Sequence, residues 1–252
     1  MMTSQRQKIF AANWKMNMSA EEAESFIQEF LQADRPADAK ILIFPPALYL
    51  SLLSQLTRDS MVTIGAQNIY WERYGAFTGE ISAPMVRGSG AGYVICGHSE
   101  RRHIFNESSE MVTRKARAAQ AEGLIPVICI GETLKEREAG ETQEVLQSDT
   151  LSSLAAVAPD KNIIIAYEPV WAIGTGLTAS PADAQAAISF IRKQIRELWG
   201  DIADDIHILY GGSVKPSNIR ELMACPDIDG ALIGGASLEV ESFLEIIRNG
   251  IR

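Results

Sequence analysis

Residues 162–168 read NIIIAYE, and this stretch decides the fold because residues 163–166 are apolar without interruption. Consecutive isoleucines favour a strand, and the lack of apolar/polar alternation predicts a strand that is covered on both faces. The run ends at a carboxylate, Glu168, and the chain continues as PVWAIGTG over residues 169–176. The stretch therefore predicts a buried parallel strand whose tip carries an acidic residue.

Seven other runs of the same kind are spread along the chain. They are KIFAANW (8–14), KILIFPP (40–46), VTIGAQ (62–67), GYVICGH (92–98), IPVICIG (125–131), HILYGG (207–212) and DGALIGG (229–235). They too are continuous rather than alternating, as parallel strands buried on both faces require.

Amphipathic helical patterns lie between these runs. Ser19 and Glu22 form a capping-box pattern. The apolar residues that follow at helical spacing are Ala23, Phe26, Ile27, Phe30 and Leu31. Ser180-Pro181 opens another helix. Its predicted buried face carries Ala187, Ile188, Ile191, Ile195 and Leu198.

The alternation of strands and helices predicts the fold class. Eight strand–helix repeats in 252 residues indicate an α/β protein, a closed (β/α)8 barrel of eight parallel strands with outer helices. A doubly wound open sheet is the alternative. The sequence shows no linker or low-complexity tract, so we expect a single barrel domain over residues 1–252.

Composition limits the class of protein and its partners. The apolar runs are too short to span a membrane, and the start MMTSQRQKIF lacks the apolar core of a signal peptide, so we expect a cytoplasmic protein. A formal net charge of −9 without a basic patch argues against nucleic acid and membrane as partners. The cysteines, Cys96, Cys129 and Cys225, lack metal-site spacing and are expected to be reduced thiols.

Polar and glycine residues stand at the predicted strand ends. In chain order they are Asn13, Lys15, His98, Glu168, Ser213, Gly234 and Gly235. The carboxyl ends of all strands of such a barrel meet on one face, where active sites of this fold are found. The candidate site therefore lies on that face.

Glu168 and His98 each stand in a setting that suits catalysis. The segment after Glu168 has the composition of a closing flap, with apolar residues 170–173 and flexible Gly174 and Gly176. A flap that expels water leaves the carboxylate in a medium of low dielectric constant, so we expect its pKa to rise. His98 precedes a predicted helix start, which disfavours the imidazolium ion and predicts a neutral donor. Each residue has an alternative role: Glu168 could cap the strand end, Trp171 could fill the core and His98 could be structural.

Five motifs in order resemble the triosephosphate isomerase family over the whole chain. They are ANWKMN (12–17), CGHSERR (96–102), AYEPVWAIGTG (166–176), YGGSVKP (210–216) and GALIGGASL (230–238). The resemblance implies an isomerase that interconverts dihydroxyacetone phosphate and D-glyceraldehyde 3-phosphate through an enediolate, in glycolysis and gluconeogenesis. The sequence has neither a cluster of metal ligands nor a dinucleotide-binding fingerprint, so we expect no metal and no cofactor. Two features depart from the family pattern: residues 88–92 are unusually rich in glycine, and Cys96 stands where a larger aliphatic residue is common.

The resemblance also implies a role for each candidate residue. Glu168 would be the base, while His98 and Lys15 would stabilise negative charge on the substrate oxygens. Asn13 would orient the substrate. The residues implied in phosphate binding are Asn13, Lys15, Gly174, Ser213, Gly234 and Gly235. Those implied in supporting the site from behind are Glu100, Tyr210 and Thr78, with Glu100 as a partner of Lys15.

A long aromatic loop, QNIYWERYGAFTGE over residues 67–80, follows the third predicted strand. If exposed, Tyr70, Trp71 and Phe77 would be an aggregation liability on a monomer, so an interface is favoured. The resemblance implies a homodimer in which this loop, with Thr78 near its tip, enters the partner subunit beside its Asn13 and His98.

Three other functions remain open. A Schiff-base aldolase on the same barrel would need a lysine buried within a strand, and a metal-dependent epimerase would need several His and Asp ligands. A sugar-phosphate-binding protein without catalysis would need no base.

Overall fold

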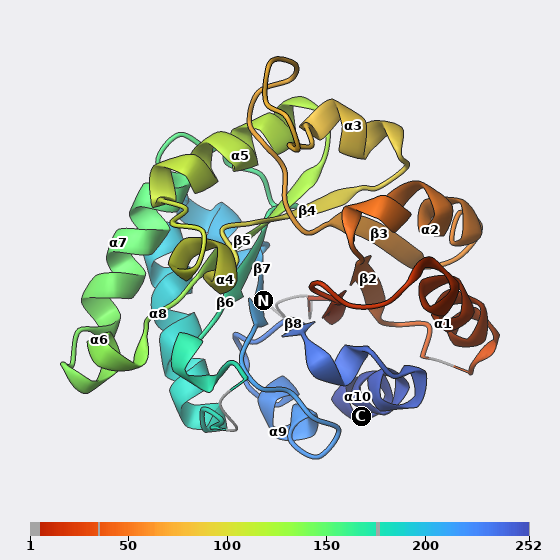
Figure 1. Cartoon of the computed structure of the whole chain (residues 1–252). Helices are drawn as coiled ribbons and strands as arrows, with labels where there is room; N and C mark the ends of the chain where they lie inside the picture. Colours follow the sequence, from red (N-terminus) through yellow and green to blue (C-terminus); the bar gives the residue numbers. More distant parts are fainter. Residues whose placement is uncertain (1–5, 35, 175–176, 252) are drawn as a thin grey trace.

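Eight parallel strands close into a barrel around which the helices form an outer ring (Figure 1). The computed structural model describes residues 6–34, 36–174 and 177–251. The strands are β1 (Ile9–Asn13), β2 (Lys40–Phe44), β3 (Val62–Ala66), β4 (Tyr93–Cys96), β5 (Ile125–Ile130), β6 (Ile164–Tyr167), β7 (His207–Tyr210) and β8 (Gly230–Ile233). They follow in chain order, and β1 pairs with β8 in the register Ile9↔Gly230. The predicted (β/α)8 barrel is confirmed, and the open-sheet alternative is wrong because the last strand returns to the first.

The helices alternate with the strands along the chain. They are α1 (Ala20–Gln32), α2 (Leu50–Leu56), α3 (Ala83–Gly88), α4 (Ser99–His103), α5 (Ser109–Ala121), α6 (Leu134–Glu138), α7 (Thr142–Leu154), α8 (Pro181–Trp199), α9 (Ile219–Met223) and α10 (Val240–Ile251), with short 3₁₀ turns η1 (Ala47–Tyr49), η2 (Val170–Ala172), η3 (Gly200–Asp204) and η4 (Gly235–Ser237). Among the described residues, no helix is both long enough and apolar enough to cross a membrane.

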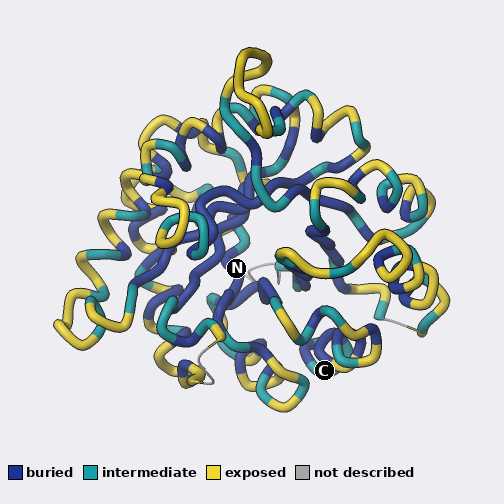
Figure 2. The backbone as a smooth tube through the Cα atoms, viewed as in Figure 1, coloured by how far each residue is buried: buried dark blue, intermediate teal, exposed yellow. Residues whose placement is uncertain are grey.

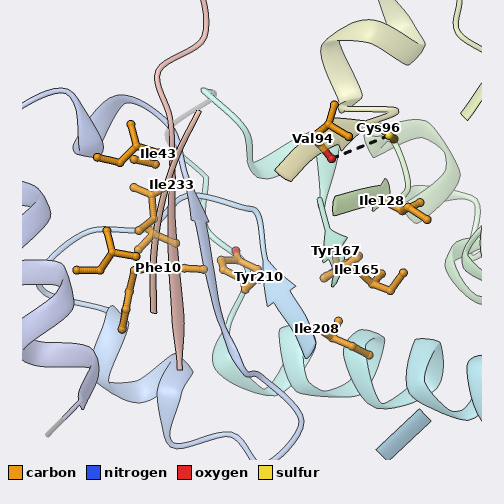
Figure 3. Close-up of a cluster of buried hydrophobic side chains, with 14 of the residues drawn as sticks. Phe10, Ile43, Val94, Cys96, Ile128, Ile165, Tyr167, Ile208, Tyr210 and Ile233 are labelled. Atoms are coloured by element: carbon orange, nitrogen blue, oxygen red, sulfur yellow. Dashed lines mark hydrogen bonds between the residues drawn. The ribbon is translucent and has the colours of Figure 1, made fainter. Parts of the chain in front are cut away.

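The strands are apolar on both faces because they separate two cores. One core fills the barrel and the other lies between barrel and helices. Figure 2 shows the strands that separate them as buried chain. Figure 3 shows part of the outer core, where Phe10, Ile165 and Ile208 contribute side chains. Cys96 belongs to the outer core and Cys129 to the inner one, so these free thiols lie on opposite faces of the sheet.

The predicted helix signals mostly match the structure. The capping box is present at α1, where the Ser19 amide donates to Glu22 Oε2 at 2.7 Å and the Glu22 amide donates to Ser19 Oγ at 3.3 Å. One predicted core residue is wrong: Leu198 of α8 is 39% exposed. The buried stripe steps from Ile195 to Trp199, four residues on, and this tryptophan packs against the core in place of Leu198.

Candidate active site

A cavity of about 270 Å³ opens at the carboxyl ends of the strands. Its walls include every residue expected to contact the substrate, namely Asn13, Lys15, His98, Glu168, Gly174, Ser213, Gly234 and Gly235. They come from the ends of β1, β4, β6, β7 and β8, which only barrel closure brings together. Gly176 lies outside the described residues.

The turn after β1 places Lys15 at the cavity. Asn13 is 5% exposed, and its Oδ1 accepts the Lys15 amide at 3.1 Å. Lys15 has a φ of 54°, in the left-handed region that non-glycine residues seldom adopt. Gln67, directly after β3, holds this conformation because its Nε2 donates to the Lys15 carbonyl at 2.7 Å. Lys15 Nζ then reaches Glu100 Oε1 at 2.8 Å, the ion pair expected from the sequence.

His98 caps the amino end of α4 through its ring. Its Nδ1 accepts the amide of Glu100 at 3.2 Å, so the neutral ring carries its proton on Nε2, which lies 3.0 Å from Glu168 Oε1. Burial lowers the pKa of His98, and the charge and hydrogen bond of Glu168 together raise it by more. A second proton on Nδ1 would face the Glu100 amide, which opposes protonation of the ring. The hydrogen bond from the Glu100 amide fits the neutral donor, whereas the carboxylates of Glu168 and Glu100 favour the imidazolium ion. The neutral donor therefore stays a prediction.

Glu168 is 2% exposed and has both carboxylate oxygens occupied. Oε1 pairs with His98 Nε2, and Oε2 accepts the amide of Ser99 at 2.8 Å. Burial raises the pKa of Glu168, but the charge and hydrogen bond of His98, helped by the Ser99 amide, lower it by more. This lowering includes the positive charge of a protonated His98. The rise in pKa expected under a closed flap, beside a neutral His98, stays a prediction.

Two glycines make room for this carboxylate, and the sequence did not single them out for it. A Cβ on Gly211 would lie 2.8 Å from Glu168 Cγ, and one on Gly131 would lie 1.8 Å from the Glu168 carbonyl oxygen. Side chains at either position would displace Glu168, so the strand ends of β5 and β7 set its place.

Sequence reasoning also missed Glu132, which anchors the segment after Glu168. Glu132 is fully buried after β5, and its Oε1 accepts Trp171 Nε1 at 2.8 Å and the Tyr167 hydroxyl at 3.1 Å. The Arg137 guanidinium lies 4.3 Å from the centre of the Trp171 ring. Trp171 thus ties η2 to β5 and α6 rather than filling the core alone. The one signal in the sequence was a carboxylate directly after the run IPVICIG.

The remaining predicted residues occupy different places. Glu100 contacts Lys15, and its Oε2 lies 3.5 Å from His98 Nδ1. Tyr210 is fully buried in the outer core behind the cavity. Thr78 is exposed in the loop between β3 and α3, which projects from the barrel (Figure 1) and does not line this chain's own cavity.

The aromatic loop is only partly as predicted. Phe77 is 41% exposed, whereas Tyr70 and Trp71 are half-buried. Their rings lie 4.1 Å apart, and the Arg114 guanidinium lies 4.4 Å from the Trp71 ring centre. The Tyr70 and Trp71 rings therefore partly cover one another, while Phe77 stays exposed. Across the described ranges, no three His, Cys, Asp or Glu side chains gather as ligands for a metal ion.

Comparison with known proteins shows to which family the chain is related. The family model described as triosephosphate isomerase matches residues 8–250. The triosephosphate isomerase of Roseiflexus sp. (strain RS-1) is 50% identical over 246 residues, covering 96% of this chain and 97% of the relative. That of Chloroflexus aurantiacus is 50% identical over 95% of this chain and 97% of the relative. That of Carboxydothermus hydrogenoformans is 48% identical over 98% of this chain and all of the relative. With a family match over nearly its whole length and the matching strand-end residues around one cavity, the chain belongs to the triosephosphate isomerase family.

Proposed function

We propose that Glu168 is the base with which this chain interconverts dihydroxyacetone phosphate and D-glyceraldehyde 3-phosphate, a step of glycolysis and gluconeogenesis. The observation that carries the proposal is a carboxylate that is 2% exposed and lies 3.0 Å from a histidine donor, at the wall of a cavity. Moving a carbonyl to the neighbouring carbon requires removal of a carbon-bound proton, which needs a base and a group that stabilises the resulting enediolate.

The contacts of Glu168 suggest how the reaction proceeds. A substrate placed between Glu168 and His98 takes over the Nε2–H that now points at the carboxylate, and this frees Oε1 to accept the carbon-bound proton. His98 and Lys15 then face the oxygens on which negative charge develops. Glu168 returns the proton to the adjacent carbon, and the hydroxyl proton passes from the oxygen of the first carbon to that of the second, so the carbonyl changes places. The carboxylate is regenerated, and no metal or cofactor is consumed.

The phosphate group fits the other side of the same cavity. Ser213, Gly234 and Gly235 line it after β7 and β8, where barrels of this type bind phosphate through backbone amides. A Cβ on Gly234 would approach Lys15 Cε to 3.4 Å, so this glycine leaves space beside the lysine. Gly174, in the segment after η2, also lines the cavity and is the remaining glycine expected to bind the phosphate.

The rival functions fit the site less well. A Schiff-base aldolase needs an uncharged lysine, whereas the Lys15 ammonium pairs with Glu100 at 2.8 Å. A binding protein without catalysis has no use for a carboxylate that is desolvated next to a ligand cavity. Such a carboxylate weakens anion binding, and a base is the function that offsets this cost.

We also propose a homodimer in the cytoplasm. A second hollow of about 290 Å³ lies beside Lys15 and is lined by Asn13, Glu100 and Phe105 among others. Nearby Met16 is 95% exposed and Phe105 62% exposed, as is typical of a surface that a partner covers. The loop 67–80 of a second copy, led by Thr78, would fill this hollow and brace Lys15.

A coupled assay in both directions tests the isomerase. We expect turnover of D-glyceraldehyde 3-phosphate and of dihydroxyacetone phosphate, before and after exhaustive EDTA treatment. Turnover of neither substrate would refute the enzyme, and activity that is lost with EDTA and restored by a divalent ion would refute the metal-independent mechanism.

A further inference from the structure

Lys215 is a cation at the cavity for which the mechanism above has no use. It lines the cavity in the loop after β7, two residues beyond Ser213, and its side chain is exposed. Among the described lysines, those in ion pairs are Lys15, Lys115 and Lys193. Lys215 is not one of them, so its ammonium group is available to a ligand.

Hydrogen bonds hold the backbone of Lys215, so its side chain starts from a fixed point beside the cavity. Asn218 Oδ1 accepts the Lys215 amide at 2.8 Å, and Asn218 Nδ2 donates to the Ser213 carbonyl at 3.1 Å. The Lys215 carbonyl accepts the amides of Asn218 and Ile219, each at 3.2 Å. Asn218 therefore holds Ser213 and Lys215 in one rigid turn beside the proposed phosphate site.

The charges around the cavity leave a role for this lysine. The Lys15 charge is offset by Glu100, and His98 faces the carboxylate of Glu168. The whole protein carries a formal charge of −9, which repels a phosphate dianion. Among the cations that line the described cavity, Lys215 is the one whose charge no neighbouring carboxylate offsets.

We propose that Lys215 recognises the phosphate dianion of the substrate, by attracting it to the cavity and adding a cationic contact at the rim of the backbone-amide site. The proposal rests on the function proposed above, and it assigns Lys215 to binding rather than to proton transfer. Lys215 contributes to capture of the substrate, so its effect on kcat/KM depends on ionic strength and on the presence of the phosphate group.

Three variants separate this role from a general charge effect. Lys215→Gln removes the charge and Lys215→Arg keeps it. Lys161→Gln removes the same charge from an exposed residue that precedes β6, at the opposite end of the barrel. For each protein we would measure inhibition by inorganic phosphate, and kcat/KM for D-glyceraldehyde 3-phosphate and for D-glyceraldehyde, at ionic strengths from about 0.01 to about 0.15 M.

For Lys215→Gln we expect inhibition by inorganic phosphate to weaken about fivefold and kcat/KM for the phosphorylated substrate to fall by a similar factor, with a shallower dependence on salt. Turnover of D-glyceraldehyde should not change, and the other two variants should resemble the wild type. An equal loss with D-glyceraldehyde, the same loss in Lys161→Gln, or unchanged phosphate inhibition would overturn the proposal. If the wild type turned over neither triose phosphate, the isomerase would be refuted, and calorimetry with inorganic phosphate would still decide the role of Lys215.

Discussion

Shortening Glu168 by one methylene tests whether its carboxylate is the base. Oε1 lies 3.0 Å from His98 Nε2, and Oε2 lies 2.8 Å from the Ser99 amide. Glu168→Asp keeps the charge but withdraws the carboxylate by about 1 Å, which takes both contacts to roughly 4 Å, beyond hydrogen-bond distance. A misplacement of this size costs about a hundredfold in rate where catalysis needs a near-attack geometry. We expect the loss in kcat and little change in KM, because other residues hold the phosphate.

Steady-state kinetics and thermal unfolding of the same samples distinguish a base from a structural cap. Glu22→Asp is the matched control, because Glu22 closes the capping box of α1 and has no contact with the cavity. That variant should lose some thermal stability and keep its kcat. If Glu168→Asp behaved in the same way, with a lower Tm and a kcat within a few-fold of the wild type, Glu168 would not be the base.

The remaining predictions concern charge, acid stability and assembly. Lys15→Met removes the cation beside the substrate oxygens and leaves Glu100 unpaired, so kcat/KM should fall steeply; an unchanged value would remove Lys15 from the site. The pKa of Glu168 is held below its ordinary value of 4.5, so its stabilisation is present above pH 4.5 and is lost as pH falls through the lower folded-state pKa. The Tm of the wild type should therefore fall more steeply below pH 4.5 than that of Glu168→Gln, and parallel curves would contradict this. Replacing residues 69–77 by a short polar turn should give poorly active monomers, and a fully active monomer in ultracentrifugation and assay would exclude the proposed interface.

Local sequence was sufficient to predict the strands and most of the helix starts and buried helix faces. A strand buried on both faces needs an uninterrupted apolar run, and the eight runs are visible without any knowledge of contacts. The capping box at Ser19 and the helix start after Ser180 are equally local, because each joins residues three positions apart. Leu198 was misjudged because helical spacing allows a step of three or four residues, and only packing chose Trp199.

The candidate site could be predicted as a set of residues but not as a geometry. The fold rule places the strand ends on one face, so the sequence by itself indicated that Lys15, His98 and Glu168 meet there. Tertiary structure decided what surrounds them: the Glu132 anchor of Trp171, the space left by Gly211, and Lys215 at the phosphate side. It also decided which partners lower the pKa of Glu168 against the effect of burial. Burial follows from sequence pattern, but a pKa depends on which partners lie within a few ångströms, and barrel closure brings those partners from distant parts of the chain.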